Sequence, residues 1–242
     1  MILAKISTGF RAAGAALLLG CALFTSTAFS ADQVFDSKAV KIDPSGMFMV
    51  GGVALKFAYY TPSWSVREQN GEGVFQASSG FPKDTASAWE TQGVFQASPT
   101  DALTFRQKID RMGDSGAHVT YHVEAAKGAT LPAQLLCLHL ALPIDAFAGK
   151  ALEVDGSPVA LPQTAGAAML FDKWGSQKLV IPVLGGKYII EGADLKLHLQ
   201  DERSFQHDRY VIWMTVAKGQ DAAASANFEI NVRFEPDAAP AK

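Results

Sequence analysis

Apolar and polar side chains alternate with a period of two through the C-terminal region of the chain, residues 187–235. Successive side chains of a β-strand point to opposite faces, so a segment with this period buries one face and exposes the other. We therefore expect three or four strands in this region. The apolar positions fall into three runs, Leu195, Leu197 and Leu199, then Tyr210, Ile212, Met214 and Val216, then Phe228, Ile230, Val232 and Phe234.

Strand-like runs also recur earlier in the chain. Residues 134–142 (QLLCLHLAL) are apolar at odd and even positions alike, which predicts a central strand covered on both faces. Asp155-Gly156 and Gly185-Gly186 are hairpin turn signals, and residues 143–149 predict a single helical turn. Together these patterns predict an all-β fold: an antiparallel β-sandwich, jelly-roll or supersandwich-like, with at most one short helix.

The first thirty residues have the layout of a bacterial secretory signal peptide. Lys5 and Arg11 form a short basic region ahead of a mostly apolar run, residues 12–24, and the small residues that follow allow cleavage before Ala31. The alternative is a lipoprotein signal with an acylated Cys21, but the chain stays apolar after Cys21, which argues against it. We expect a periplasmic or extracellular protein, with one β-sandwich domain over residues 31–236 and a disordered tail over 237–242. No later stretch is a candidate for a transmembrane helix.

Charge and cysteine content narrow the choice of partners. Cleavage would remove Lys5 and Arg11 and so make the net charge of −3 more negative. A net negative charge argues against nucleic acid and anionic membrane surfaces, which bind basic patches. Cys137 would be the only remaining thiol, so no intramolecular disulfide is expected.

One hexapeptide occurs twice. Residues 73–78 (GVFQAS) recur as residues 93–98. Two equivalent strands in one sheet would explain the repeat, and a single duplication is too short for a solenoid. Two convenient strands without functional meaning are the simpler interpretation.

Histidine and cysteine give no convincing metal or nucleophile site. His118 and His122 are four residues apart, and on a strand this separates them by roughly 13 Å, too far to bind one ion without further ligands. Cys137 and His139 share one face of the predicted central strand but lie among leucines, which favours a buried, inert thiol. We predict no metal and no cofactor.

A charged cluster between two of the C-terminal strands supplies the only weak catalytic candidates, Asp201, Glu202 and His207. Two carboxylates could serve as the acid and base of a glycoside hydrolase. Adjacent residues on a strand point to opposite faces, however, so Asp201 and Glu202 do not flank one substrate unless the turn redirects them. The alternative is a solvated loop in which nearby arginines pair with the acids.

Aromatic residues near turns are better candidates for ligand binding. A flat ring can stack on the apolar face of a sugar while polar side chains at the rim bond its hydroxyl groups. Core packing is the competing interpretation for each ring. The predicted stacking residues are Tyr60, Trp64, Trp89 and Trp174, and the predicted polar rim is Asp201, Arg203 and His207.

Four short segments carry a resemblance to β-sandwich modules of secreted bacterial proteins that handle polysaccharides. They are residues 147–150 (FAGK), 152–156 (LEVDG), 199–203 (LQDER) and 210–214 (YVIWM). The resemblance covers roughly residues 117–236 and implies a carbohydrate ligand.

Three classes of function fit these observations. The first is an exported, non-catalytic carbohydrate-binding protein, which we expect. The second is a glycan-active lyase or hydrolase on a sandwich scaffold. The third is an envelope protein-interaction or structural module that uses an exposed strand edge or apolar patch to bind a protein partner.

Overall fold

The computed structural model describes residues 40–43, 45–50, 53–97, 102–125, 133–218 and 225–238. The predicted signal peptide, Cys21 and the last four residues of the predicted tail lie outside these ranges. Within them, no helix is long and apolar enough to cross a membrane.

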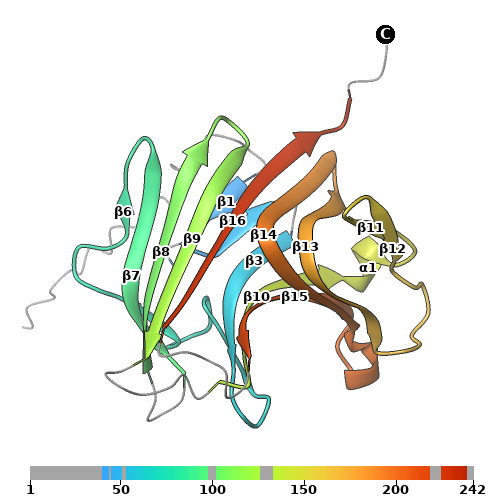
Figure 1. The fold of residues 1–242 in the computed structure, drawn as a ribbon, viewed down its shortest axis with the longest axis horizontal. Helices are drawn as coiled ribbons and strands as arrows, with labels where there is room; N and C mark the ends of the chain where they lie inside the picture. Colours follow the sequence, from blue (N-terminus) through green and yellow to red (C-terminus); the bar gives the residue numbers. More distant parts are fainter. Residues whose placement is uncertain are drawn as a thin grey trace, which may run out of the picture.

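The chain is all-β, as the alternating pattern predicts (Figure 1). Within the described residues, its helical elements are α1 (Ile144–Phe147), in the segment predicted to form one turn, and the 3₁₀ turn η1 (Glu202–Phe205). The strands are β1 (Val40–Ile42), β2 (Phe48–Val50), β3 (Val53–Tyr60), β4 (Val66–Glu68), β5 (Phe75–Ala77), β6 (Lys83–Asp84), β7 (Ala88–Gln96), β8 (Ala102–Met112), β9 (Gly116–Ala125), β10 (Leu135–Pro143), β11 (Ala151–Val154), β12 (Ser157–Ala160), β13 (Met169–Val183), β14 (Gly186–Asp201), β15 (Arg209–Lys218) and β16 (Ser225–Pro236).

All sixteen strands join one antiparallel sheet. The main path of hydrogen-bonded neighbours runs β1-β2-β3-β10-β15-β14-β16-β9-β8-β7-β5. As predicted, β10 is a central strand: it pairs with β3 and β15, and its first six residues are buried. The predicted hairpins are also present. β11 and β12 are joined through Asp155-Gly156 as predicted, and β13 and β14 through Leu184-Gly185, one residue earlier than the predicted Gly185-Gly186.

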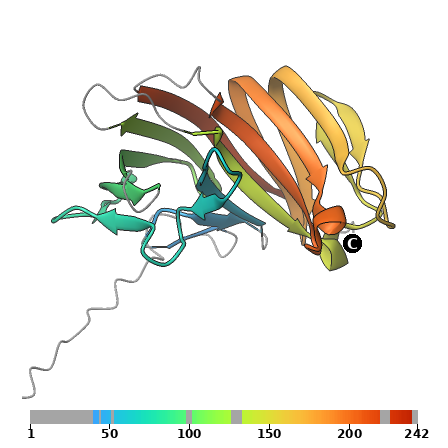
Figure 2. The ribbon, with the colours of Figure 1, turned by 90° about the horizontal axis from the view of Figure 1, so that it is seen from below.

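The sheet curls because β14 belongs to both of its halves. Residues 186–191 of β14 pair with β16, whereas residues 197–201 pair with β15. We call β1, β2, β3, β10, β15 and the end of β14 the first arm. The start of β14 with β16, β9, β8, β7 and β5 forms the second arm. Figure 2 shows the curved path from the green strands β8 and β9 to the orange strands β14 and β15.

The two arms face each other across an aromatic core. Phe57 of β3 lies 5.3 Å from Phe95 of β7 and 5.3 Å from Phe105 of β8, and 6.5 Å from Tyr121 of β9, measured between ring centroids. These four side chains are at most 2% exposed. The hydrogen-bonded path is thus continuous, while the packing brings its two arms together in layers.

Two buried glutamines connect the arms by hydrogen bonds. The Nε2 of Gln69, at the end of β4, donates to the Oε1 of Gln107 on β8 at 2.8 Å. Gln107 in turn donates to the carbonyl of Gly46 and to the Tyr121 hydroxyl, at 2.9 and 3.1 Å. The backbone N–H of Phe57 donates to Gln69 at 3.0 Å. Because both glutamines are nearly fully buried, these bonds offset the cost of removing their amides from water.

The two copies of the hexapeptide pair with each other. Phe75 lies opposite Phe95, so β5 and β7 are antiparallel neighbours in one sheet, as expected. Their environments are not equivalent, however. Val74 is 5% exposed just ahead of β5, whereas Val94 on β7 is 46% exposed. Ser98 lies outside the described residues.

Candidate functional site

The four aromatic residues predicted to bind a ligand do not form one site. Tyr60 and Trp64 lie together, with ring centroids 6.1 Å apart, but Tyr60 is 7% exposed and Trp64 is 52% exposed. Trp174 is 61% exposed on β13, with the Lys196 ammonium 4.9 Å from the centre of its ring. Trp89 is 3% exposed and belongs to the core. Trp89 therefore cannot stack on an external sugar, and this assignment is corrected.

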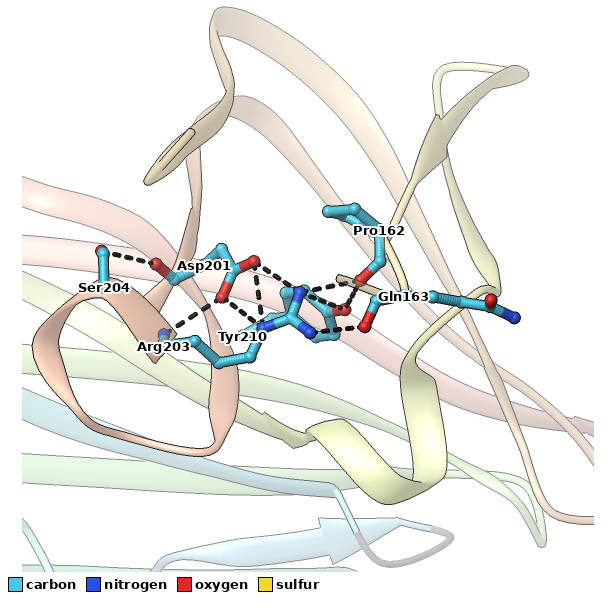
Figure 3. Close-up of polar contacts among 6 residues, drawn as sticks. All are labelled: Pro162, Gln163, Asp201, Arg203, Ser204 and Tyr210. Carbon is cyan, nitrogen blue, oxygen red and sulfur yellow. Dashed lines mark hydrogen bonds and ion pairs between the residues drawn. The ribbon is translucent and has the colours of Figure 1, made fainter. Parts of the chain in front are cut away.

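The predicted polar rim is an internal anchor (Figure 3). Asp201 is 1% exposed, and Arg203 donates to its carboxylate at 2.6 Å. Arg203 also donates to the backbone carbonyls of Pro162 and Gln163, at 2.8 and 2.6 Å. The hydrogen bond from Arg203 lowers the pKa of Asp201. The pair ties the loop after β12 to the end of β14.

The other two catalytic candidates are no better placed. Glu202 is 8% exposed and accepts from Arg209 at 2.6 Å, while His207 is exposed beside η1. A general acid must carry a proton near neutral pH, whereas the hydrogen bond from Arg203 lowers the pKa of Asp201. The Glu202 carboxylate is already bonded to Arg209. The arrangement fits the alternative of acids paired with nearby arginines.

Cys137 and His139 lie on the face of β10 opposite the main core, and both are nevertheless fully buried. The Nδ1 of His139 is 2.7 Å from the Glu68 carboxylate, which also accepts from Lys56 at 2.6 Å. Burial raises the pKa of the Cys137 thiol well above its ordinary value. A thiol that resists ionisation and has no access to solvent is a poor nucleophile, in agreement with the inert thiol predicted from the sequence.

A groove of about 760 Å³ crosses the second arm over four neighbouring strands, β7, β8, β9 and β16. Gln107 and Tyr121 from the middle of these strands are buried in the core. Because side chains alternate along a strand, their neighbours in sequence point outward and line the groove. The half-buried Phe81 lies at its β7 end, with the Lys83 ammonium 4.8 Å from the ring centre.

Strand register arranges the groove residues in two rows. The first, which we call the acidic row, consists of Glu90, Lys108, Thr120 and Glu229 in strand order. The second, which we call the arginine row, consists of Gln92, Arg106, His122 and Asn227. Residues two apart on a strand are separated by roughly 7 Å, so the rows form two parallel lines of polar groups.

The histidines of the second arm are held by asparagines on β16. The Nδ1 of His122 is 2.7 Å from the Oδ1 of Asn227, and the Nδ1 of His118 is 2.9 Å from the Oδ1 of Asn231. An amide oxygen only accepts, so Nδ1 carries the proton in both rings. This fixes the ring orientations and leaves the amide NH₂ of each asparagine to donate elsewhere.

A second hollow of about 610 Å³ continues the groove towards β13. It is lined by His118 and Asn231, by Glu191 of β14 and by Lys178 of β13. Glu229 lines both hollows. The polar surface therefore extends over six strands, a span of roughly 24 Å at the usual strand spacing.

The charges of the two rows differ. Lys108 is 2.7 Å from Asp110, and this ion pair together with the nearby Glu90 raises the pKa of Lys108. Among the described residues, no carboxylate lies within ion-pair distance of Arg106, which is exposed. The arginine row itself contains no acid, so it holds an uncompensated guanidinium.

The groove residues are not among the ligand-binding candidates drawn from the sequence. The sequence of β8 and β9 does show that these residues alternate with core residues, and this alternation predicts an outward polar face. The sequence does not predict the register that aligns β7, β8, β9 and β16. His122 and Asn227, for example, are 105 residues apart in the chain.

No known protein family matches the chain, and no curated protein sequence matches it. Over the described ranges, no three His, Cys, Asp or Glu side chains are grouped so that they could hold a metal ion.

Proposed function

We propose that the protein is an exported, non-catalytic glycan-binding protein and that its binding site is the groove across β7, β8, β9 and β16. The observation that carries the proposal is the pair of polar rows. They place amide, hydroxyl, imidazole and charged groups side by side on four rigid strands. Sites on strands hold their side chains more exactly than sites on loops.

A glycan fits this arrangement because its hydroxyl groups both donate and accept hydrogen bonds. Gln92 and Asn227 offer amides at the two ends of the arginine row, and Glu90 and Glu229 offer acceptors at the two ends of the acidic row. The edge of the Phe81 ring supplies a limited apolar surface at one end. The groove is thus more polar than a typical drug-like pocket, which is mostly apolar.

The resemblance to modules of secreted polysaccharide-handling proteins supports the same ligand class, although its segments lie outside the groove. Export through the N-terminal signal peptide and a periplasmic or extracellular location belong to the proposal as well. The absence of an available acid–base pair at Asp201 and Glu202 supports binding without catalysis.

The test is a glycan-array screen of the mature protein, from Ala31, followed by titration of the best hit. We expect Gln92→Ala and Asn227→Ala each to weaken binding by about tenfold, the effect of losing a hydrogen bond worth roughly 1.4 kcal/mol. Trp174→Ala is the matched surface control and should bind as the wild type does.

Two results would overturn the proposal. If no glycan binds, the glycan-binding class is wrong, and the search turns to envelope protein partners. If binding is lost in Trp64→Ala or Trp174→Ala but not in the groove variants, the site is wrong. Incubation of the bound glycan with the protein, followed by analysis of its length, distinguishes binding from cleavage.

A further inference from the structure

We infer that the groove selects an acidic glycan, whose carboxylate binds at Arg106. This inference rests on the proposed function and names the class of ligand. It derives from the charge difference between the two rows.

The charge of Arg106 is isolated. Lys108, two residues further along β8, is paired with Asp110 at 2.7 Å. Arg106 has no such partner among the described residues, and its neighbours across the strands are Gln92 and His122, neither of which is an acid. The nearest acid on β9, Glu124, faces the Nε2 of His122 at 3.8 Å and is 57% exposed. The guanidinium is therefore available to an anion from solution.

Amide N–H donors lie beside Arg106. The Oδ1 of Asn227 already accepts from His122, so its NH₂ group is the part that remains for a ligand. Gln92 supplies a second amide NH₂ on the opposite side of Arg106. A guanidinium flanked by N–H donors matches the two oxygens of a carboxylate, which it can bind through two parallel hydrogen bonds.

The acidic row orients the ligand. Glu90 and Glu229 lie one row away, roughly 7 Å along the strands. They repel a carboxylate but accept hydrogen bonds from hydroxyl groups. A sugar that carries one carboxylate and several hydroxyls is therefore oriented across the groove, with its acid at the arginine row and hydroxyls at the acidic row.

The experiment compares uronate-containing glycans with the same glycans after methyl esterification, which removes the charge and keeps the sugar. The array should carry acidic, sulfated and neutral glycans, so that sulfate recognition is distinguished from carboxylate recognition. We expect uronate glycans to bind best, esterification to weaken binding by about 10- to 100-fold, and added salt to weaken it further.

Variants at Arg106 complete the test. Arg106→Gln should reduce affinity for the uronate glycan to that for its ester, and Arg106→Lys should retain part of the affinity because it keeps the charge without the planar fork. The matched control is Arg67→Gln, which should bind as the wild type does. Arg67 is an exposed arginine of β4, which pairs with β3 of the first arm.

The outcomes separate this inference from the proposed function. Binding of neutral glycans that is sensitive to Gln92→Ala but indifferent to Arg106→Gln refutes the acidic ligand and keeps the glycan-binding groove. A preference for sulfated over uronate glycans refutes the carboxylate. If no glycan binds, both are wrong.

Discussion

Among single side chains, the partly buried carboxylate of Glu68 should govern acid sensitivity. Burial opposes its ionisation, but the hydrogen bonds from His139 and Lys56 outweigh burial and lower the pKa of Glu68 from 4.5 to about 2. Because the pKa is lower in the folded state, ionised Glu68 stabilises the fold above about pH 4.5. This contribution is lost as the pH falls through the folded-state pKa, about 2.

We expect Glu68→Gln to lower the free energy of unfolding by about 2 kcal/mol at pH 7, after allowance for the partial exposure of the side chain. The difference from the wild type should shrink between pH 4.5 and 2, where protonated Glu68 resembles glutamine. Urea unfolding of both proteins across this range measures it. A difference that does not change with pH would show that Glu68 acts through packing alone.

Predicted site residues lie at positions where the sequence alone leaves two roles open. Asp201 and Arg203 look like a rim of charged groups, but their mutual ion pair and the carbonyls of residues 162 and 163 occupy them. Trp89 looks like a turn aromatic, yet it packs beneath the loop at Gly46. The Asp201–Arg203 pair is local, but the carbonyls that hold Arg203 and the loop that covers Trp89 come from distant segments, which local sequence patterns do not specify.

At the scale of single elements, the turn between β11 and β12 illustrates how local chemistry predicts structure. Asp155 and Gly156 have φ values of 49° and 80°, the left-handed conformation that a two-residue hairpin of this type needs. The Asp155 carboxylate also accepts from the backbone N–H groups of Gln177 and Lys178, at 2.9 and 3.0 Å, beside a bulge in β13. The turn thus fixes β11 against β13 as well as β12.

Replacement of Gly156 by alanine should cost about 1–2 kcal/mol of stability, because the added Cβ is strained at positive φ even though it meets no neighbouring atom. Thermal unfolding measures the loss, which Gly156→Asn should largely avoid since asparagine tolerates this conformation. Gly166→Ala, at an open position without positive φ, is the control. Equal effects of the two alanine substitutions would contradict the strain argument.

Strand faces and hairpins follow from short-range patterns, whereas the neighbours of each strand do not. Period-two alternation predicts correctly that Leu195, Leu197 and Leu199 are buried. It does not predict that β9 pairs with β16 or that β10 lies between β3 and β15. The groove depends on these long-range pairings, so its polar rows could be recognised only once the register was known.

For the whole molecule, the continuous sheet and shared core predict cooperative unfolding. The described strands form one hydrogen-bonded sheet, and the main buried cluster includes residues of both arms, among them Phe57 and Tyr121. Truncation of Phe57 to alanine should cost about 3–5 kcal/mol. Because Phe57 packs against three strands of the opposite arm, the loss should weaken both arms together.

Two tryptophans on opposite arms allow this to be measured. Trp89 reports on β7 of the second arm and Trp213 on β15 of the first. The chain has four tryptophans, so the variants must have the other three replaced and keep only Trp89 or only Trp213. Denaturant unfolding followed by the fluorescence of each variant should give midpoints that coincide with that from circular dichroism. Phe57→Ala should shift both midpoints equally. Separate midpoints, or a shift confined to Trp213, would mean that the arms unfold independently and that the curl at β14 acts as a hinge between two units.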